Sequence, residues 1–185
     1  SLAEVDREKT ILYSSFEMMN EDNFIYGKFE PQKKYSNKKL NNPYFPVLAG
    51  LASGCALLIP KNCFNIVGLF NPELKYTQDS EMWFRLFPKF NIKFHPDITY
   101  ISRRHKAQRT NNNDERQVRE NNELYINMIN EISCEQMCEI SGTELRFFNE
   151  ILDVVYELNY IYAAKYIEER INKLKLLNNN LNMNT

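Results

Sequence analysis

The feature that most constrains the fold is a change of residue pattern along the chain. Short runs rich in aromatic and β-branched residues predict strands, and they are confined to its first part: 11–18, 24–27, 53–60, 92–95 and 98–101. After these runs, residues 113–132 and 143–177 show helical periodicity. The sequence therefore predicts an α/β domain over residues 1–110, followed by a helical extension over residues 111–185.

Further local signals divide the first part. Residues 43–51 and 62–67 predict short helices, and a third is expected to begin with Asp79 or Ser80 as its cap and to end before Pro88. The lysine- and asparagine-rich residues 31–42 predict a mobile loop. The run at 53–60 begins with small residues and ends at a proline, which predicts a buried strand.

Composition excludes some classes of function. Hydrophobic residues make up 43% of the 185 residues, enough for a packed core. Lysine and arginine number 23 against 24 aspartates and glutamates, so the chain lacks the basic excess of a nucleic-acid-binding domain. We therefore expect no nucleic-acid partner.

The cysteines indicate a reducing compartment. Cys55, Cys63, Cys134 and Cys138 form no Cys-x-x-Cys pair, and Cys134 and Cys138 are spaced poorly for a disulfide. The chain shows neither a signal peptide nor an apolar stretch of the roughly 18 residues needed for a membrane span. We expect free thiols and a cytoplasmic protein.

Asp79 is the first candidate for chemistry. It lies four residues before Trp83, so both project from one face of the expected helix. A carboxylate at a helix N-terminus is held ionised by the helix dipole, which suits a proton acceptor at neutral pH. The plainer interpretation is that Asp79 only caps the helix, and Trp83 is equally consistent with a core position.

A second polar cluster follows the last expected strand. It contains Arg103, Arg104 and His105, with Lys106 and Arg109 close behind. His105 is compatible with a metal ligand, a phosphate donor or a surface histidine, because one histidine does not make a metal site. The basic residues fit phosphate binding or simple solvation.

Several linked blocks resemble family 2 glycosyltransferases of the GT-A fold. They span about residues 10–110 in order, beginning with the strand at 10–22. The others are GCALLIPK at 54–61, VGLFNPEL at 67–74 (similar to the family's VGxFxxxL turn), QDSEMWFRL at 78–86 (its ED helix) and YISRRHKAQRT at 100–110 (its YxxRxHxxQxS loop). Such enzymes have a Rossmann-like fold, so the resemblance implies a partial GT-A domain with a small mixed sheet.

The resemblance implies an inverting sugar transfer for polysaccharide or glycoconjugate synthesis in the cell envelope. Asp79 would be the general base, and His105 would help to bind Mg²⁺ or Mn²⁺ or the diphosphate. The donor would be a nucleotide-sugar, most simply a UDP-sugar, and the acceptor a glycan or lipid-linked molecule. The substrate-binding residues would be Gly54, Trp83, Arg103 and Arg109.

The chain departs from the family pattern in three ways. Gln78 replaces the usual glutamate, and Lys106-Ala107 replaces a frequent Pro-Gly. The nucleotide-binding strand and the Asp-x-Asp metal motif are also absent, so we expect the donor half to lie outside this chain and the chain alone to be inactive. The alternative is a non-catalytic module for glycan binding or assembly.

The C-terminal helical segment carries a broad apolar face. Its positions follow three- and four-residue steps: Leu145, Phe148, Leu152, Val155, Tyr162 and Tyr166, widened by Phe147, Ile151, Val154, Leu158 and Ile161. Such a face must be covered. Packing on the α/β part is the simplest prediction, and a homodimer, another domain or the inner face of a membrane are the alternatives. The basic residues Arg170, Lys173 and Lys175 favour the membrane surface.

Overall fold

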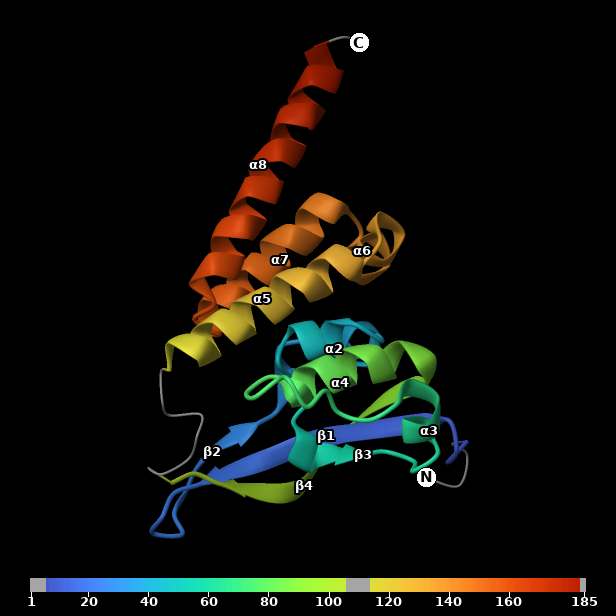
Figure 1. Ribbon diagram of the computed structural model, residues 1–185, viewed down its shortest axis with the longest axis vertical. Helices are drawn as coiled ribbons and strands as arrows, with labels where there is room; N and C mark the ends of the chain where they lie inside the picture. Colours follow the sequence, from blue (N-terminus) through green and yellow to red (C-terminus); the bar gives the residue numbers. More distant parts are fainter. Residues whose placement is uncertain (1–5, 106–113, 184–185) are drawn as a thin grey trace. The chain divides into compact units, whose positions relative to one another are not determined.

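The strand β1 (Thr10–Met19) is the centre of a four-stranded mixed sheet. The computed structural model describes residues 6–105 and 114–183, and side chains as far as residue 179 (Figure 1). β2 (Ile25–Phe29) and β3 (Leu57–Leu58) pair with β1 in antiparallel fashion, whereas β4 (Asn91–Arg103) pairs with it in parallel. The predicted α/β class with a small mixed sheet and a helical extension is confirmed.

β4 corrects the expectation of two separate strands around Pro96 and Asp97. Its pairing with β1 runs from Thr10 and Asn91 to Met19 and Arg103. Ser14 pairs with His95 and the next residue pairs with Ile98, so Pro96 and Asp97 are left out of the ladder. Proline cannot donate a ladder hydrogen bond, and this irregularity lets one strand continue past it.

The core of the sheet forms around Tyr13, whose side chain is fully buried. Its hydroxyl donates a 2.7 Å hydrogen bond to the carbonyl of Leu40, and its ring lies 5.0 Å from that of Phe94. Burial without a charged partner raises the pKa of Tyr13 far above its ordinary value. The hydroxyl of Tyr13 is thus carried into the core and hydrogen-bonded there.

Four helices accompany this sheet: α1 (Asn37–Leu40), α2 (Phe45–Leu48), α3 (Cys63–Val67) and α4 (Gln78–Leu86). α2 and α4 lie over the same face of the sheet (Figure 1). The expected helices at 43–51 and 62–67 are confirmed as α2 and α3, and α3 ends at Gly68 with φ of 82°.

Two expectations for this part were wrong. Residues 31–42 contain the 3₁₀ turn Pro31–Lys33 and α1, which is capped by Ser36, so they are not an irregular loop. The run at 53–60 is not a buried strand, because it consists of the 3₁₀ turn Gly54–Ala56 and the two residues of β3. Only one edge of β3 is paired in the sheet, and Leu58 is 63% exposed.

The second part consists of α5 (Glu115–Glu131), α6 (Cys134–Ser141), α7 (Glu144–Glu157) and α8 (Ile161–Met183). Compact units divide at Ser1–Glu115 and Arg116–Thr185, and each is described by itself. The single long helix expected at 143–177 was wrong. It is interrupted at Asn159, whose φ of 59° lies in the left-handed region that ends helices. α6 begins with a capping box between Ser133 and Gln136.

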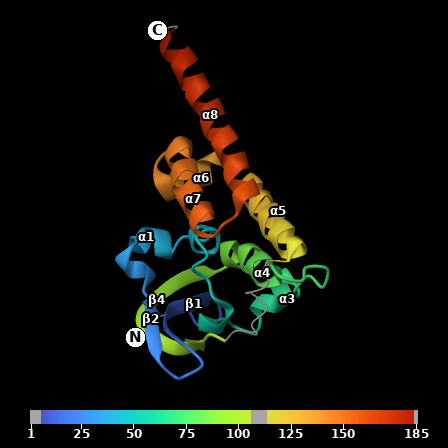
Figure 2. The ribbon, with the colours of Figure 1, turned by 90° about the vertical axis from the view of Figure 1, so that its left-hand side faces the viewer.

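The predicted apolar face is buried at its centre, which lies on α7. α7 packs against α6 and α8 (Figure 2). The buried residues of α7 are Phe147, Phe148, Ile151, Val154 and Val155. On α8 the buried residues are Ala163, Ala164, Ile167 and Ile171, and Leu176 and Leu177 farther along the helix are exposed. The prediction was wrong for Ile161 and Tyr162, which belong to the predicted face but are exposed.

Two further predictions concern disulfide bonds and membrane-spanning helices. All four cysteines are free thiols. No helix in the described ranges is both long enough and apolar enough to cross a bilayer.

Candidate active site

The first turn of α4 lies beside Gly54, close to the second half of β4. α4 leads through a short turn into the start of β4, so the helix runs back along the strand toward the edge of the sheet where the parallel strands β1 and β4 end. Ligands of open α/β sheets bind at this edge. A hydrogen bond of 3.1 Å between the hydroxyls of Ser53 and Tyr100 connects the residue before Gly54 to the second half of β4.

Asp79 is not the cap of α4. The helix begins earlier than expected, with Thr77 as its N-cap, whose carbonyl accepts a 3.0 Å hydrogen bond from the amide of Glu81. Asp79 is the second residue of the helix, so its carboxylate is not used to satisfy the helix end. The capping interpretation is therefore wrong, and another role for the carboxylate is open.

The Asp79 carboxylate lies beside Gly54. A Cβ atom built on Gly54 would be 3.3 Å from Oδ2 of Asp79. Among the described residues the carboxylate has neither a hydrogen bond nor an ion pair, although the residue reaches solvent. Desolvation by the protein around the carboxyl group raises the pKa of Asp79 above its ordinary value of 3.8. A carboxylate in this state is a stronger proton acceptor.

Trp83 is buried directly beneath this position. Its indole is 5% exposed, and Phe70 packs edge-on against it with ring centroids 5.8 Å apart. The Cβ position of Gly54 lies 3.6 Å from Cζ2 of the indole. The indole Nε1 is buried without a hydrogen-bond partner in the described part of the chain. Unpaired buried donors are uncommon, and they call for an explanation.

An aromatic cluster extends from the same edge of the sheet. The ring of Phe16 stacks on Phe29 at 4.6 Å and lies 4.9 Å from Tyr100. These side chains come from the consecutive strands β1 and β2 and from β4, which is remote from them in the sequence. No periodic pattern in the sequence indicates that Phe16, Phe29 and Tyr100 lie together.

The basic residues predicted for the site lie at the end of β4. Arg103 pairs with Met19 in the sheet, and both Arg103 and His105 are exposed. Arg109 lies outside the described residues. In the described ranges no three His, Cys, Asp or Glu side chains are grouped so that they could hold a metal. His105 therefore does not complete a metal site with these residues, and we derive no step through a metal.

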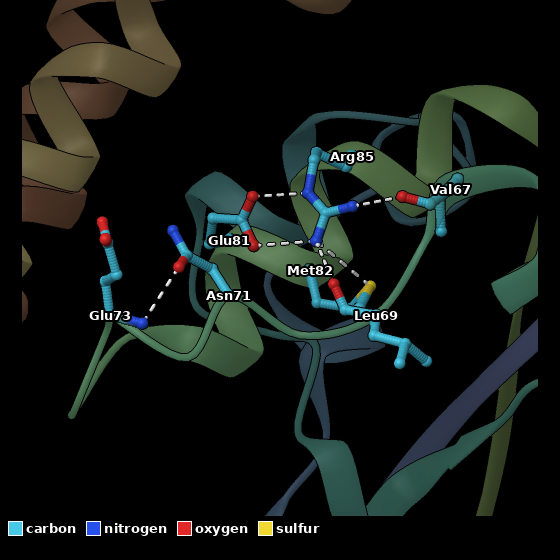
Figure 3. A network of polar contacts seen from close by, with 7 residues as sticks. All are labelled: Val67, Leu69, Asn71, Glu73, Glu81, Met82 and Arg85. Atoms are coloured by element: carbon cyan, nitrogen blue, oxygen red, sulfur yellow. Dashed lines mark hydrogen bonds and ion pairs between the residues drawn. The ribbon is translucent and has the colours of Figure 1, made fainter.

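A polar network fixes the loop that carries Phe70 (Figure 3). Arg85 on α4 donates hydrogen bonds to the carbonyl oxygens of Val67 and Leu69, at 2.5 Å and 3.1 Å. It also forms a bidentate ion pair with the carboxylate of Glu81. Farther along the loop, Asn71 accepts a 3.0 Å hydrogen bond from the amide of Glu73. Arg85 thus holds the segment after α3 against the helix that bears Asp79.

We expect Arg85→Ala to lower the free energy of unfolding by about 2 kcal/mol, because it leaves two carbonyls and the Glu81 carboxylate without their donor. Urea titration followed by circular dichroism measures this change. Lys33→Ala is the matched control, since its ion pair with Glu30 is carried by a side chain that is 72% exposed. That control should cost at most about 0.5 kcal/mol. Equal losses in the two variants would contradict the role given to Arg85.

A separate cavity of about 740 Å³ lies along the outer side of β4. Amide side chains and Lys93 line much of it, including Gln32, Asn37, Asn41 and Asn91. None of the predicted site residues lines this cavity. The volume of this cavity does not by itself identify an active site. The Asp79 carboxylate, whose pKa is raised by desolvation, lies in the first turn of α4 and does not line this cavity.

Known proteins similar to this chain come from Rickettsia. An uncharacterized glycosyltransferase of Rickettsia prowazekii is 32% identical over 160 residues, which are 86% of this chain and 50% of that protein. The similarity supports a glycosyltransferase. A second uncharacterized glycosyltransferase, from Rickettsia typhi, is 31% identical over the same shares of both chains. A third, from Rickettsia conorii, is 33% identical over 149 residues, which are 79% of this chain and 24% of that protein.

The chain spans about half the length of the first two glycosyltransferases. No protein-family model matches it, and no solved structure matches it. The similarity covers both the region of Asp79 and much of the helical unit, since it extends over most of this chain.

Proposed function

We propose that the chain is the acceptor-side part of a glycosyltransferase in which Asp79 is the general base. The observation that carries this proposal is the state of the Asp79 carboxylate. It lies in the first turn of α4, it caps nothing, it has no partner among the described residues, and its pKa is raised by desolvation. Perturbed and unpaired carboxyl groups at the carboxyl edge of a sheet are candidates for catalysis.

The proposed reaction is a displacement at the anomeric carbon of a nucleotide-sugar. Asp79 accepts the proton of an acceptor hydroxyl, and the acceptor oxygen forms a bond to the anomeric carbon. The bond from that carbon to the diphosphate oxygen breaks, and its electron pair leaves with the nucleoside diphosphate. Attack opposite to the leaving group inverts the configuration at the anomeric carbon. General-base catalysis of this kind contributes about 10²–10⁴-fold to the rate.

The finer features follow the resemblance to family 2 enzymes of the GT-A fold. The donor is proposed to be a UDP-sugar bound by another part of the protein, and the acceptor a glycan or lipid-linked molecule of the cell envelope. Arg103 and Arg109 are proposed to bind the substrate, and His105 to bind Mg²⁺ or Mn²⁺ together with groups outside this chain. Hard cations of this type neutralise charge on a departing diphosphate.

The test is the stereochemistry of transfer by the whole protein that contains this chain. UDP-sugars of known anomeric configuration are incubated with the protein, Mn²⁺ and a panel of glycan acceptors, and the product is analysed by proton NMR. We expect a product of opposite configuration. Retained configuration would contradict a single displacement with Asp79 as base. A folded protein that binds glycans without transferring sugar would instead support the binding-module alternative.

A further inference from the structure

The cavity along β4 is lined by side-chain amides with unused hydrogen-bonding groups. Its volume of about 740 Å³ is that of a ligand-binding pocket. We call it the amide pocket, after Gln32, Asn37, Asn41 and Asn91 in its lining. The side chains of Asn37 and Asn91 have no hydrogen-bond partner among the described residues. Gln32 uses its Oε1, which accepts a 3.1 Å hydrogen bond from the hydroxyl of Ser15, and keeps its amide hydrogens for another partner.

Two of the pocket amides are held in place by the fold. Nδ2 of Asn41 donates a 2.7 Å hydrogen bond to the carbonyl of Asn37, and its Oδ1 accepts a 2.8 Å hydrogen bond from the backbone amide of Phe94. This side chain therefore ties α1 to β4 (Figure 2). Gln32 is held to β1 through Ser15. Polar groups that are positioned before a ligand arrives lose less conformational entropy when it binds.

The chemistry of the lining favours a neutral ligand with many hydroxyl groups. Among the described residues that line the pocket, the charged ones are Asp6 and Lys93, which carry opposite charges. A phosphorylated ligand would need several positive groups around it. An amide side chain both donates and accepts hydrogen bonds, and so does a hydroxyl group. A saccharide without charge therefore matches this lining better than an anion does.

A peptide strand is the other ligand that an unpaired sheet edge can bind. In the described structure β4 pairs with β1 alone, so its second edge is open. An added strand needs a row of free backbone groups, but the amide of Phe94 is already bonded to Asn41. Two residues farther along the strand, Pro96 has no amide hydrogen to donate. The edge beside the pocket is therefore poorly suited to strand addition.

We propose that the amide pocket is a non-catalytic binding site for a neutral oligosaccharide. The pocket lies where β1 and β4 begin, since Thr10 and Asn91 line it. Asp79 belongs to the other end of the sheet, beside the second half of β4. The inference goes beyond the proposed function and does not depend on Asp79 being the base. The amides bind the hydroxyls of the glycan, and Pro96 adds apolar surface for the C–H groups of a sugar ring.

NMR titration of the 185-residue chain tests this site, because the side-chain amide signals of Gln32, Asn37 and Asn91 come from the pocket itself. The neutral probes are maltotriose, cellotriose, mannotriose and chitotriose. Inorganic phosphate serves as the anionic probe, and an extended hexapeptide of threonine and valine as the strand probe. We expect saturable shifts of the three signals with at least one neutral trisaccharide, and no saturable shift with phosphate or the hexapeptide.

Asn91→Ala should weaken the binding of that trisaccharide about three- to tenfold, because the ligand loses the hydrogen bonds of one amide. The Asn91 side chain is exposed and bonds to no described residue, so the fold should not depend on it. Asn65→Ala is the matched control, since Asn65 is an exposed asparagine of α3 that does not line the pocket. It should bind as the unaltered chain does. Circular dichroism verifies the folding of both variants.

Several results would overturn the inference. They are the absence of a response to every neutral trisaccharide, undiminished binding by Asn91→Ala, and an equal loss in Asn65→Ala. A response to the hexapeptide alone would make the edge of β4 a strand-binding site, and a response to phosphate alone would make the pocket an anion site.

Asp79→Asn separates this inference from the proposed function. The variant should bind the trisaccharide in the amide pocket as tightly as the unaltered chain, because Asp79 does not line the pocket. Weaker binding by this variant would show that the glycan occupies the candidate active site instead, which would contradict the inference. Transfer by the whole protein without glycan binding in the pocket would refute the pocket and leave the reaction standing. Glycan binding in the pocket without sugar transfer would do the reverse.

Discussion

Asp79→Asn is expected to lower the rate of sugar transfer by the whole protein about 10²–10⁴-fold, because the amide keeps the shape of the side chain but cannot accept the proton. The loss should appear in kcat, with the acceptor KM changed much less. Steady-state kinetics with the acceptor found in the transfer assay measure both constants.

The same variant should not lose stability. Desolvation raises the pKa of Asp79 above 3.8 in the folded chain, so the folded state binds this proton more tightly than the unfolded state. The contribution of Asp79 to stability therefore falls as pH rises from the ordinary pKa through the raised one, and above that window the ionised group opposes folding. Because Asn carries no charge, Asp79→Asn should unfold at the same or a higher urea concentration than the unaltered chain at neutral pH.

Asp97→Asn is the control for this prediction. Its carboxylate is 79% exposed and lies 3.7 Å from His95, in the irregular part of β4. We expect unchanged transfer from this variant. If Asp79→Asn transferred sugar at the normal rate, Asp79 would not be the base. If it lost both transfer and folding, Asp79 would be a structural residue, and the loss of rate would say nothing about proton transfer.

Tyr13→Ala is expected to have the largest effect on stability. The side chain is fully buried in the central strand, where it packs on Phe94 and Phe87. Removing such a ring leaves a cavity and costs about 3–5 kcal/mol. Urea unfolding of the α/β unit, followed by the fluorescence of Trp83, should show this loss as a lower midpoint.

Tyr13→Phe separates the hydrogen bond from the packing. The ring is kept, but the carbonyl of Leu40 loses its 2.7 Å donor inside the core. A buried acceptor left without its partner costs about 1–3 kcal/mol, so this variant should lie between the unaltered chain and Tyr13→Ala. Tyr26→Ala is the control, since this tyrosine of the neighbouring strand is 51% exposed. A loss as large in Tyr26→Ala would contradict the special place of Tyr13.

The local sequence pattern was sufficient to predict those helices and strands that are determined mainly by their own residues. The aromatic and β-branched run at 11–18 predicted β1, and the periodic segment closed by Pro88 predicted α4. The capping box from Ser133 to Gln136 was equally visible in the sequence and would have marked the start of α6. Asn159 was a readable helix terminator as well, although its left-handed conformation is only one of those open to asparagine.

Tertiary structure decided the rest, including whether Asp79 caps its helix. The sequence by itself determined that a carboxylate stands in the first turn of a helix and left open whether it caps that helix. The structure decided the question by starting α4 at Gln78 with Thr77 as its N-cap and by placing the carboxylate against Gly54, which is remote in the chain. Desolvation depends on which distant residues exclude water from a group, and pairing across Pro96 depends on the partner strand β1. Neither the desolvation of Asp79 nor the strand pairing across Pro96 can be predicted from the neighbouring residues in the sequence, because both are set by contacts that form only when the chain folds.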